Sequence, residues 1–129
     1  MSPRPVVLDT NFLLIPFQFK IDIMRELDYL LDVSHRYVIS SRTIYELNKI
    51  GESIGKDGMA ARLAIKLVEA NKAKIDIVQS DVFVDQWIED YAIAHKAIVC
   101  TNYSALKKKK KNLDIKTVTM KSKSKLGFV

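Results

Sequence analysis

The sequence predicts an α/β fold, a parallel sheet with helices on both faces. Short β-branched runs alternate with segments of helical apolar spacing over most of the chain, and this alternation is typical of strands joined by crossover helices. The length of 129 residues suits one domain. No apolar run approaches the roughly 18 residues that a membrane helix requires, so no membrane partner is expected.

Five short apolar segments are the expected strands, because β-branched residues fit a pleated surface that is covered on both faces. They comprise residues 6–9, 36–40, 74–79, 97–101 and 115–120. The first four are each followed by a segment too long for a hairpin turn, so neighbouring strands are expected to run parallel.

Segments with helical spacing fill the connections. Residues 21–33 place Ile23, Leu27, Leu30 and Leu31 on one stripe, as an amphipathic helix requires. By the same criterion the other expected helices are residues 41–50, 59–72, 80–96 and 103–111, with loops at 16–19 and at the glycine-punctuated residues 51–58.

Positive charge is concentrated at the end of the chain. Residues 107–129 hold nine lysines against one acid, Asp114, whereas the first 106 residues are slightly acidic. We therefore expect a domain of residues 1–120 and a basic C-terminal tail of residues 121–129. Such an end favours a polyanion partner, nucleic acid or an anionic surface, although charge alone fits a solubilising tail equally well.

The cysteine count and the first residues predict a cytoplasmic protein. The single cysteine, Cys100, cannot form an internal disulfide, and its place in the apolar run AIVCT predicts a buried structural thiol. The opening segment, MSPRPVVLDT, lacks the apolar core of a signal peptide.

Polar side chains follow the ends of the expected strands. Asp9 ends the first strand, Glu46 lies in the helix after the second, Asp85 in the helix after the third, and Asn102 just past the fourth. Ligands of open α/β sheets bind beyond the carboxyl ends of the strands. We therefore expect these four residues to face the same edge of the sheet.

Carboxylates that lie close together need a compensating cation. Mg²⁺ or Mn²⁺ takes oxygen ligands, keeps several waters, and can assist water attack on a phosphodiester. The sequence has no Cys/His spacing for zinc, no glycine-rich phosphate loop and no nucleophile-elbow motif. Taken singly, each acid also fits an ordinary cap or surface residue, so the argument depends on the set.

Three segments in this order resemble the PIN domain, a nuclease fold: VVLDTNFLL, ISSRTIYELNKI and VDQWIEDYAIAHKAIVCTN. The segments LDTNFLLIPFQFKIDIMREL and GKDGMAARLAIKL, with the lysine-rich end, are most similar to an archaeal PIN branch. That branch is related to the eukaryotic PIN nuclease of small-subunit ribosomal RNA processing. The resemblance implies a five-stranded parallel sheet of order 3-2-1-4-5 and metal-dependent endoribonuclease activity.

The resemblance also implies which residues form the site. The catalytic and metal-binding acids of the family fall on Asp9, Glu46 and Asp85. The polar groups expected beside them are Asn11, Thr101 and Asn102.

One position departs from the family pattern. Tyr103 stands where the family usually has a fourth carboxylate. Asp81 precedes Asp85 by four residues, one helical turn in the expected helix, so it is a candidate replacement for that metal ligand.

The expected function is therefore a Mg²⁺- or Mn²⁺-dependent endoribonuclease that acts on structured RNA, for example a ribosomal RNA precursor. Two alternatives remain open: a toxin ribonuclease of a toxin–antitoxin pair, and an RNA-binding assembly factor with weakened catalysis. The expected partners are RNA, contacted through Lys107, Lys108, Lys109, Lys110 and Lys111, a second copy of the chain, and an antitoxin or ribosome-assembly proteins.

Overall fold

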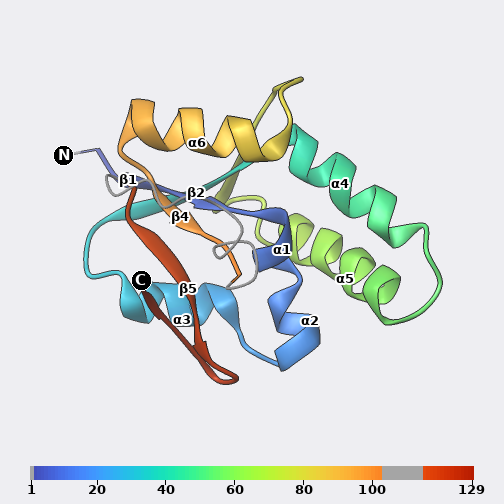
Figure 1. Cartoon of the computed structure of the whole chain (residues 1–129). Helices are drawn as coiled ribbons and strands as arrows, with labels where there is room; N and C mark the ends of the chain where they lie inside the picture. The colour runs from blue at the N-terminus through green and yellow to red at the C-terminus, as the bar shows by residue number, and fades with distance from the viewer. Residues whose placement is uncertain (1, 103–114) are drawn as a thin grey trace.

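A six-stranded sheet, in the order β3-β2-β1-β4-β5-β6, forms the centre of the protein (Figure 1). The computed structural model describes residues 2–102 and 115–129. All strand pairs are parallel except β5 with β6. The parallel order 3-2-1-4-5 is therefore confirmed, with a sixth strand added at one edge. The strands are β1 (Arg4–Leu8), β2 (His35–Ser40), β3 (Ile75–Val78), β4 (Ile98–Cys100), β5 (Thr117–Ser122) and β6 (Lys125–Phe128).

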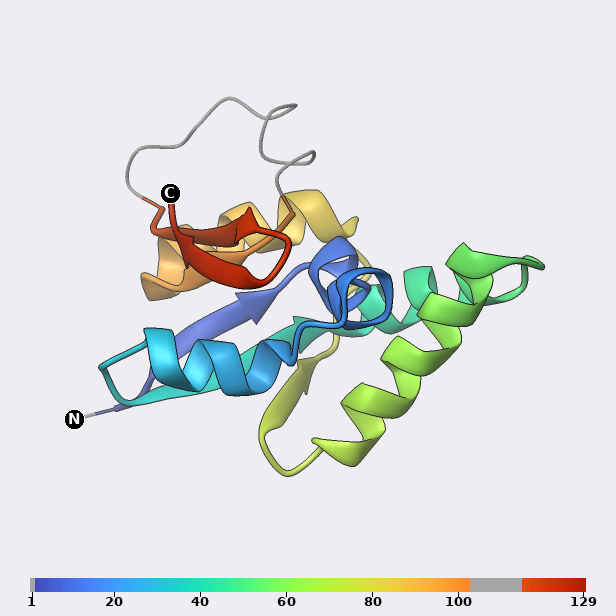
Figure 2. The same ribbon diagram turned by 90° about the horizontal axis from the view of Figure 1, so that it is seen from below.

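Helices cover both faces of the sheet. Helix α6 lies on one face, and α1, α2, α3 and α5 lie on the other, as Figures 1 and 2 show from two directions. No helix among the described residues is long and apolar enough to cross a membrane. The helices are α1 (Thr10–Leu13), α2 (Ile15–Phe19), α3 (Ile23–Leu30), α4 (Ser41–Gly51), α5 (Lys56–Ala70) and α6 (Val84–His95).

Strand β1 is the most deeply buried part of the sheet. Val6, Val7 and Leu8 are fully buried, with β2 on one side and β4 on the other. Side chains alternate along the strand, so Val6 and Leu8 join the core beneath α1–α3, whereas Val7 joins the core beneath α6. An uninterrupted apolar strand is what burial on both faces requires.

Three connections differ from the expectation. Helix α5 begins at Lys56, inside the expected loop at residues 51–58. The expected loop at residues 16–19 is part of α2, because Pro16 lies in the first turn, where its missing N–H costs nothing. Helix α6 begins at Val84 rather than at Ser80. Ser80 is held outside the helix, because its main-chain N–H and C=O groups are both hydrogen-bonded to the Ser41 hydroxyl. Its own hydroxyl accepts a hydrogen bond from the Val82 amide.

The expectation that residues 121–129 form a tail outside the domain is wrong, because these residues include the end of β5 and strand β6. Strand β5 continues to Ser122, and β6 returns antiparallel to it, with Leu126 opposite Met120 and Phe128 opposite Val118. Leu126 is buried in the main core and Phe128 packs against that core. Leu126 and Phe128 are two positions apart, so both point to the same face of the strand. The surrounding lysines obscured this pattern in the sequence.

Helix α3 is fixed to the sheet by a carboxylate. Asp28 accepts a hydrogen bond from the Tyr37 hydroxyl at 2.7 Å, and His35 Nε2 lies 3.0 Å from the same oxygen. Partial burial opposes ionisation of Asp28, but the hydrogen bonds from Tyr37 and His35 outweigh it and lower its pKa. His35 begins β2, so this contact lies at the amino ends of the strands.

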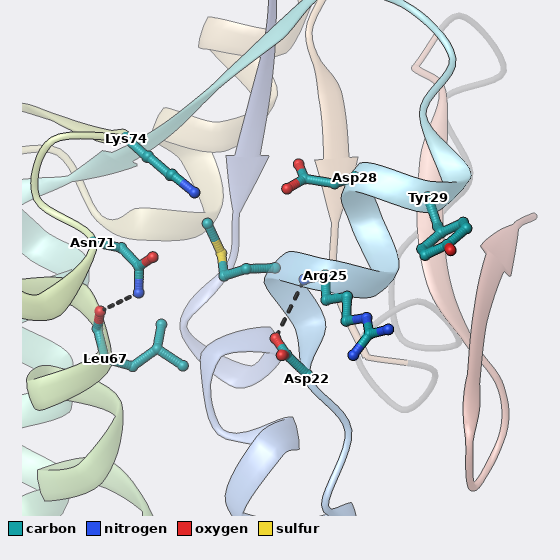
Figure 3. A pocket seen from close by; sticks show the side chains of 8 residues that line it. Asp22, Arg25, Asp28, Tyr29, Leu67, Asn71 and Lys74 are labelled. Atoms are coloured by element: carbon teal, nitrogen blue, oxygen red, sulfur yellow. Dashed lines mark hydrogen bonds between the residues drawn. The ribbon is translucent and has the colours of Figure 1, made fainter.

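A groove of about 680 Å³ runs beside this contact, between α3 and the end of α5 (Figure 3). Arg25 and Asp28 line it from α3, and Lys74 lines it from the segment just before β3. Lys74, like Asp28, lies near the amino ends of the strands. The groove is therefore distinct from the edge where the candidate acids were expected.

If β6 belongs to the folded domain, Leu126→Ala lowers the free energy of unfolding by about 2 kcal/mol, because it leaves a cavity beside β5. Denaturant unfolding measures this loss. Lys125→Ala, at the exposed neighbouring position, is the control and changes stability by less than about 0.5 kcal/mol. If both variants change the free energy of unfolding by equally small amounts, β6 does not contribute to the folded domain.

The lowered pKa of Asp28 predicts a stability difference that depends on pH. A carboxyl whose folded pKa lies below its ordinary value of 3.8 stabilises the protein above that pH and loses its effect as the pH falls. Tyr37→Phe removes the hydroxyl donor, so it should destabilise the protein more at about pH 6 than at about pH 3. Denaturant unfolding at both pH values measures this, with exposed Tyr29→Phe as the control. An equal loss at both pH values would contradict the role of Asp28.

Candidate active site

Asp9 lies directly after β1 and caps helix α1. Its side chain is 5% exposed, and its carboxylate accepts from the Thr10 amide at 2.8 Å, the Thr101 hydroxyl at 2.9 Å and the Asn11 side-chain amide at 3.3 Å. A buried carboxylate needs such donors to remain ionised. The carboxylate is therefore oriented by the protein.

Thr10 links Asp9 to the next candidate acid. The Thr10 amide donates to Asp9, while its hydroxyl donates to Glu46 Oε1 at 2.7 Å. Glu46 is partly buried on α4, the helix that follows β2. Two acids that are 37 positions apart are thus joined through one buried threonine. Sequence reasoning missed Thr10, although its place in the Asp-Thr-Asn triplet could have indicated it.

Asn11 connects this pair to the end of β4. Its side-chain oxygen accepts from the Thr101 hydroxyl at 3.2 Å and from the Asn102 main-chain amide at 2.9 Å. Thr101 is buried and Asn102 is half-buried, and both follow β4 directly. The predicted polar residues Asn11, Thr101 and Asn102 therefore gather around Asp9 at the carboxyl ends of two adjacent strands.

Asp85 and Asp81 occupy different settings. Asp85 lies in the first turn of α6 and is exposed, on the helix that covers the opposite face of the sheet from α1. Asp81 precedes the helix, so the expectation that it shares a helical face with Asp85 is wrong. Tyr103 and the lysines at 107–111 lie outside the described residues.

The donor set around Asp9 fits a hard divalent cation. Asp9 and Glu46 present carboxylate oxygens, and each such oxygen can accept more than one contact. Oxygen donors are what Mg²⁺ and Mn²⁺ prefer. Within residues 2–102 and 115–129, no three His, Cys, Asp or Glu side chains already form a compact metal-binding group. A cation would therefore need the outer acids to approach Asp9, or waters to complete its shell.

Cys100 contributes no nucleophile to this site. The thiol is fully buried, and burial together with the nearby charge of Asp9 raises its pKa far above the ordinary value. It therefore stays protonated at neutral pH, in agreement with the structural role expected from its apolar surroundings.

The chain is similar to known proteins in sequence and in fold. The chain is 31% identical to ribonuclease VapC9 of Archaeoglobus fulgidus over 87% of this chain and 79% of the relative. It is 30% identical to ribonuclease VapC4 of Methanocaldococcus jannaschii, over 92% and 91% of the two chains. A solved structure of the PIN domain endonuclease Utp24 superposes with a TM-score of 0.74, at 23% identity, over 98% of this chain and 91% of that one.

The match extends to a family model. Residues 6–123 match the model described as a PIN like domain. This span includes most of β1, the Asp9–Thr10–Glu46 connection and the residues Thr101 and Asn102 that follow β4. The chain therefore belongs to the PIN-like domain family.

Proposed function

We propose that the protein is an endoribonuclease that uses Mg²⁺ or Mn²⁺ held by Asp9, Glu46 and Asp85. The observation that carries the proposal is the buried Asp9 carboxylate, joined through Thr10 to Glu46 at the carboxyl ends of the strands. Two relatives at 30% identity or more are named ribonucleases. This supports RNA as the substrate.

The protein's own residues prepare the site for phosphodiester hydrolysis. When bound, the cation lowers the pKa of a coordinated water and neutralises charge that develops on the phosphate. Thr10, Asn11 and Thr101 fix the orientation of Asp9 by three hydrogen bonds. Thr10 also fixes one oxygen of Glu46. The side chains therefore lose little additional freedom when they bind a cation and substrate.

Asp85 is the acid that faces solvent in this proposal. Its carboxylate lies in the first turn of α6, where the helix dipole favours negative charge. With Asp9 and Glu46 it would hold the cation, and Asp81 in the preceding segment would be an additional acid. The lysines at 107–111 would hold the RNA backbone as point charges.

The proposed substrate is structured RNA such as a ribosomal RNA precursor, in a cytoplasmic setting with ribosome-assembly proteins as partners. A toxin ribonuclease with an antitoxin partner would use the same acids, and the two VapC relatives favour this second candidate. Growth arrest after expression of the wild type alone, absent for Asp9→Asn, would identify the toxin function.

Asp9→Asn should abolish both RNA cleavage and stabilisation by Mg²⁺, because only a ligand bound to the native state shifts unfolding. Without metal, the variant should lose about 1–3 kcal/mol of stability, since the asparagine oxygen still accepts from the Thr10 amide but its nitrogen cannot accept from Asn11 and Thr101. Thermal unfolding with and without millimolar Mg²⁺ measures both effects. Exposed Asp32→Asn is the matched control, and equal stabilisation of the two variants by Mg²⁺ would remove Asp9 from the site.

Thr10→Val should weaken Mg²⁺ binding several-fold, because it removes the hydroxyl that fixes Glu46 while keeping the amide that fixes Asp9. Thr10→Ser restores the hydroxyl and should recover the affinity. Calorimetric titration of both variants with Mg²⁺ measures this difference. If the valine and serine variants bind alike, the contact with Glu46 has no part in positioning the metal ligands.

A further inference from the structure

Two aromatic rings are exposed beside the candidate acids. Tyr45 is 48% exposed and directly precedes Glu46 on α4. Phe83 is 74% exposed and lies two residues before Asp85. The rings are therefore carried by the same two segments as Glu46 and Asp85, two of the proposed metal ligands.

Arg42 joins the two rings into one surface. Its guanidinium carbon lies 4.5 Å from the centre of the Tyr45 ring and 5.5 Å from the centre of the Phe83 ring. Lys49, one helical turn after Tyr45, places its Nζ atom 5.8 Å from the centre of the Tyr45 ring. The Arg42 Nε atom is buried and has no hydrogen-bond acceptor among the described residues. The guanidinium is therefore held by cation–π contacts.

A pair of hydrogen bonds fixes the two segments that carry these rings. The Ser41 hydroxyl donates to the Ser80 carbonyl at 3.2 Å and accepts from the Ser80 amide at 3.0 Å. Figure 1 shows the first turn of α4 beside the segment that enters α6. The Tyr45, Phe83 and Arg42 surface is therefore assembled before any ligand arrives, and binding it would order few side chains.

Packing alone does not account for this surface. Single exposed apolar residues are normal on soluble proteins, but here two rings and two cations come together from the two segments that carry Glu46 and Asp85. Aromatic faces with adjacent positive charge fit the flat base and the phosphate of a single-stranded nucleic acid. Duplex RNA offers no exposed base faces for such stacking.

We propose that Tyr45, Phe83 and Arg42 form a stacking platform for unpaired bases of RNA next to the phosphodiester that is cut. The inference rests on the proposed nuclease function and narrows its substrate to single-stranded segments, such as loops or joints within structured RNA. The rings stack on bases, and the cations Arg42 and Lys49 attract the adjoining phosphates. Sequence preference is set elsewhere, because every base has a stacking face.

The test compares RNA binding by full-length variants in EDTA, so that cleavage does not interfere. The double variant Tyr45→Leu/Phe83→Leu keeps apolar side chains but removes both rings. Tyr45→Phe/Phe83→Tyr keeps both rings. Tyr29→Leu removes a tyrosine that is 80% exposed on α3, away from the site, and is the matched control. The probes are a single-stranded RNA of about 12 nucleotides that contains 2-aminopurine and a duplex of equal length.

The double leucine variant should bind the single-stranded probe at least about 10-fold more weakly and lose the quenching of 2-aminopurine fluorescence. The same variant should bind the duplex with the affinity of the wild type. The ring-preserving variant and Tyr29→Leu should bind both the single strand and the duplex as the wild type does. Thermal unfolding verifies that each variant is folded.

Three results would overturn the platform. The first is that the double leucine variant binds the single strand as tightly as the wild type. The second is that it loses equal affinity for the single strand and the duplex. The third is a changed oligomeric state in gel filtration with unchanged RNA binding, which would identify a protein contact. The nuclease proposal fails separately, if wild type neither binds Mg²⁺ nor cleaves RNA. Loss of single-strand binding by the leucine variant would support the platform in that case too.

Discussion

The hydrogen bond from the Thr10 amide to the Asp9 carboxylate joins the central strand to the first helix, and the rest of the site is arranged around it. The same carboxylate accepts from Thr101 after β4, and the same threonine reaches Glu46 on α4. Together, these contacts hold the start of α1, the end of β4 and helix α4 in fixed relative positions. Because Asp9 is buried, each of these donors also offsets the cost of desolvating its charge.

The site divides into a rigid inner part and an exposed outer part. Asp9 and Thr101 are buried and held by several hydrogen bonds, whereas Asp85 faces solvent. The aromatic rings of Tyr45 and Phe83 lie on the outer side as well. An inner part that orients ligands and an outer part that meets the polymer suit an enzyme whose substrate is much larger than its catalytic centre.

Periodicity predicted the parallel sheet, and the strand ends predicted that Asp9 and Asn102 lie at the same edge. Asn11 and Thr101, which contact Asp9, were expected from the family resemblance. Residues that act through contacts between distant segments were not predictable in this way. Nothing in the sequence indicates that Thr10 contacts Glu46. Ser80 is expected to begin a helix, and nothing in the sequence indicates that its main chain is hydrogen-bonded to Ser41 instead. In the C-terminal region, the lysines are typical of a solvated tail, whereas the strand depends on only two apolar residues, Leu126 and Phe128, that face the core.

Strand β6 also changes how the sheet ends. A parallel sheet that stopped at β5 would leave a row of unpaired main-chain groups open to another chain, a recognised route to edge-to-edge association. The hairpin covers that row with a strand only four residues long, which begins at an exposed lysine, Lys125. Short edges that carry charge make poor templates for strand addition. The lysine-bearing hairpin thus makes this edge of the sheet a poor site for strand addition, and β3 forms the other edge.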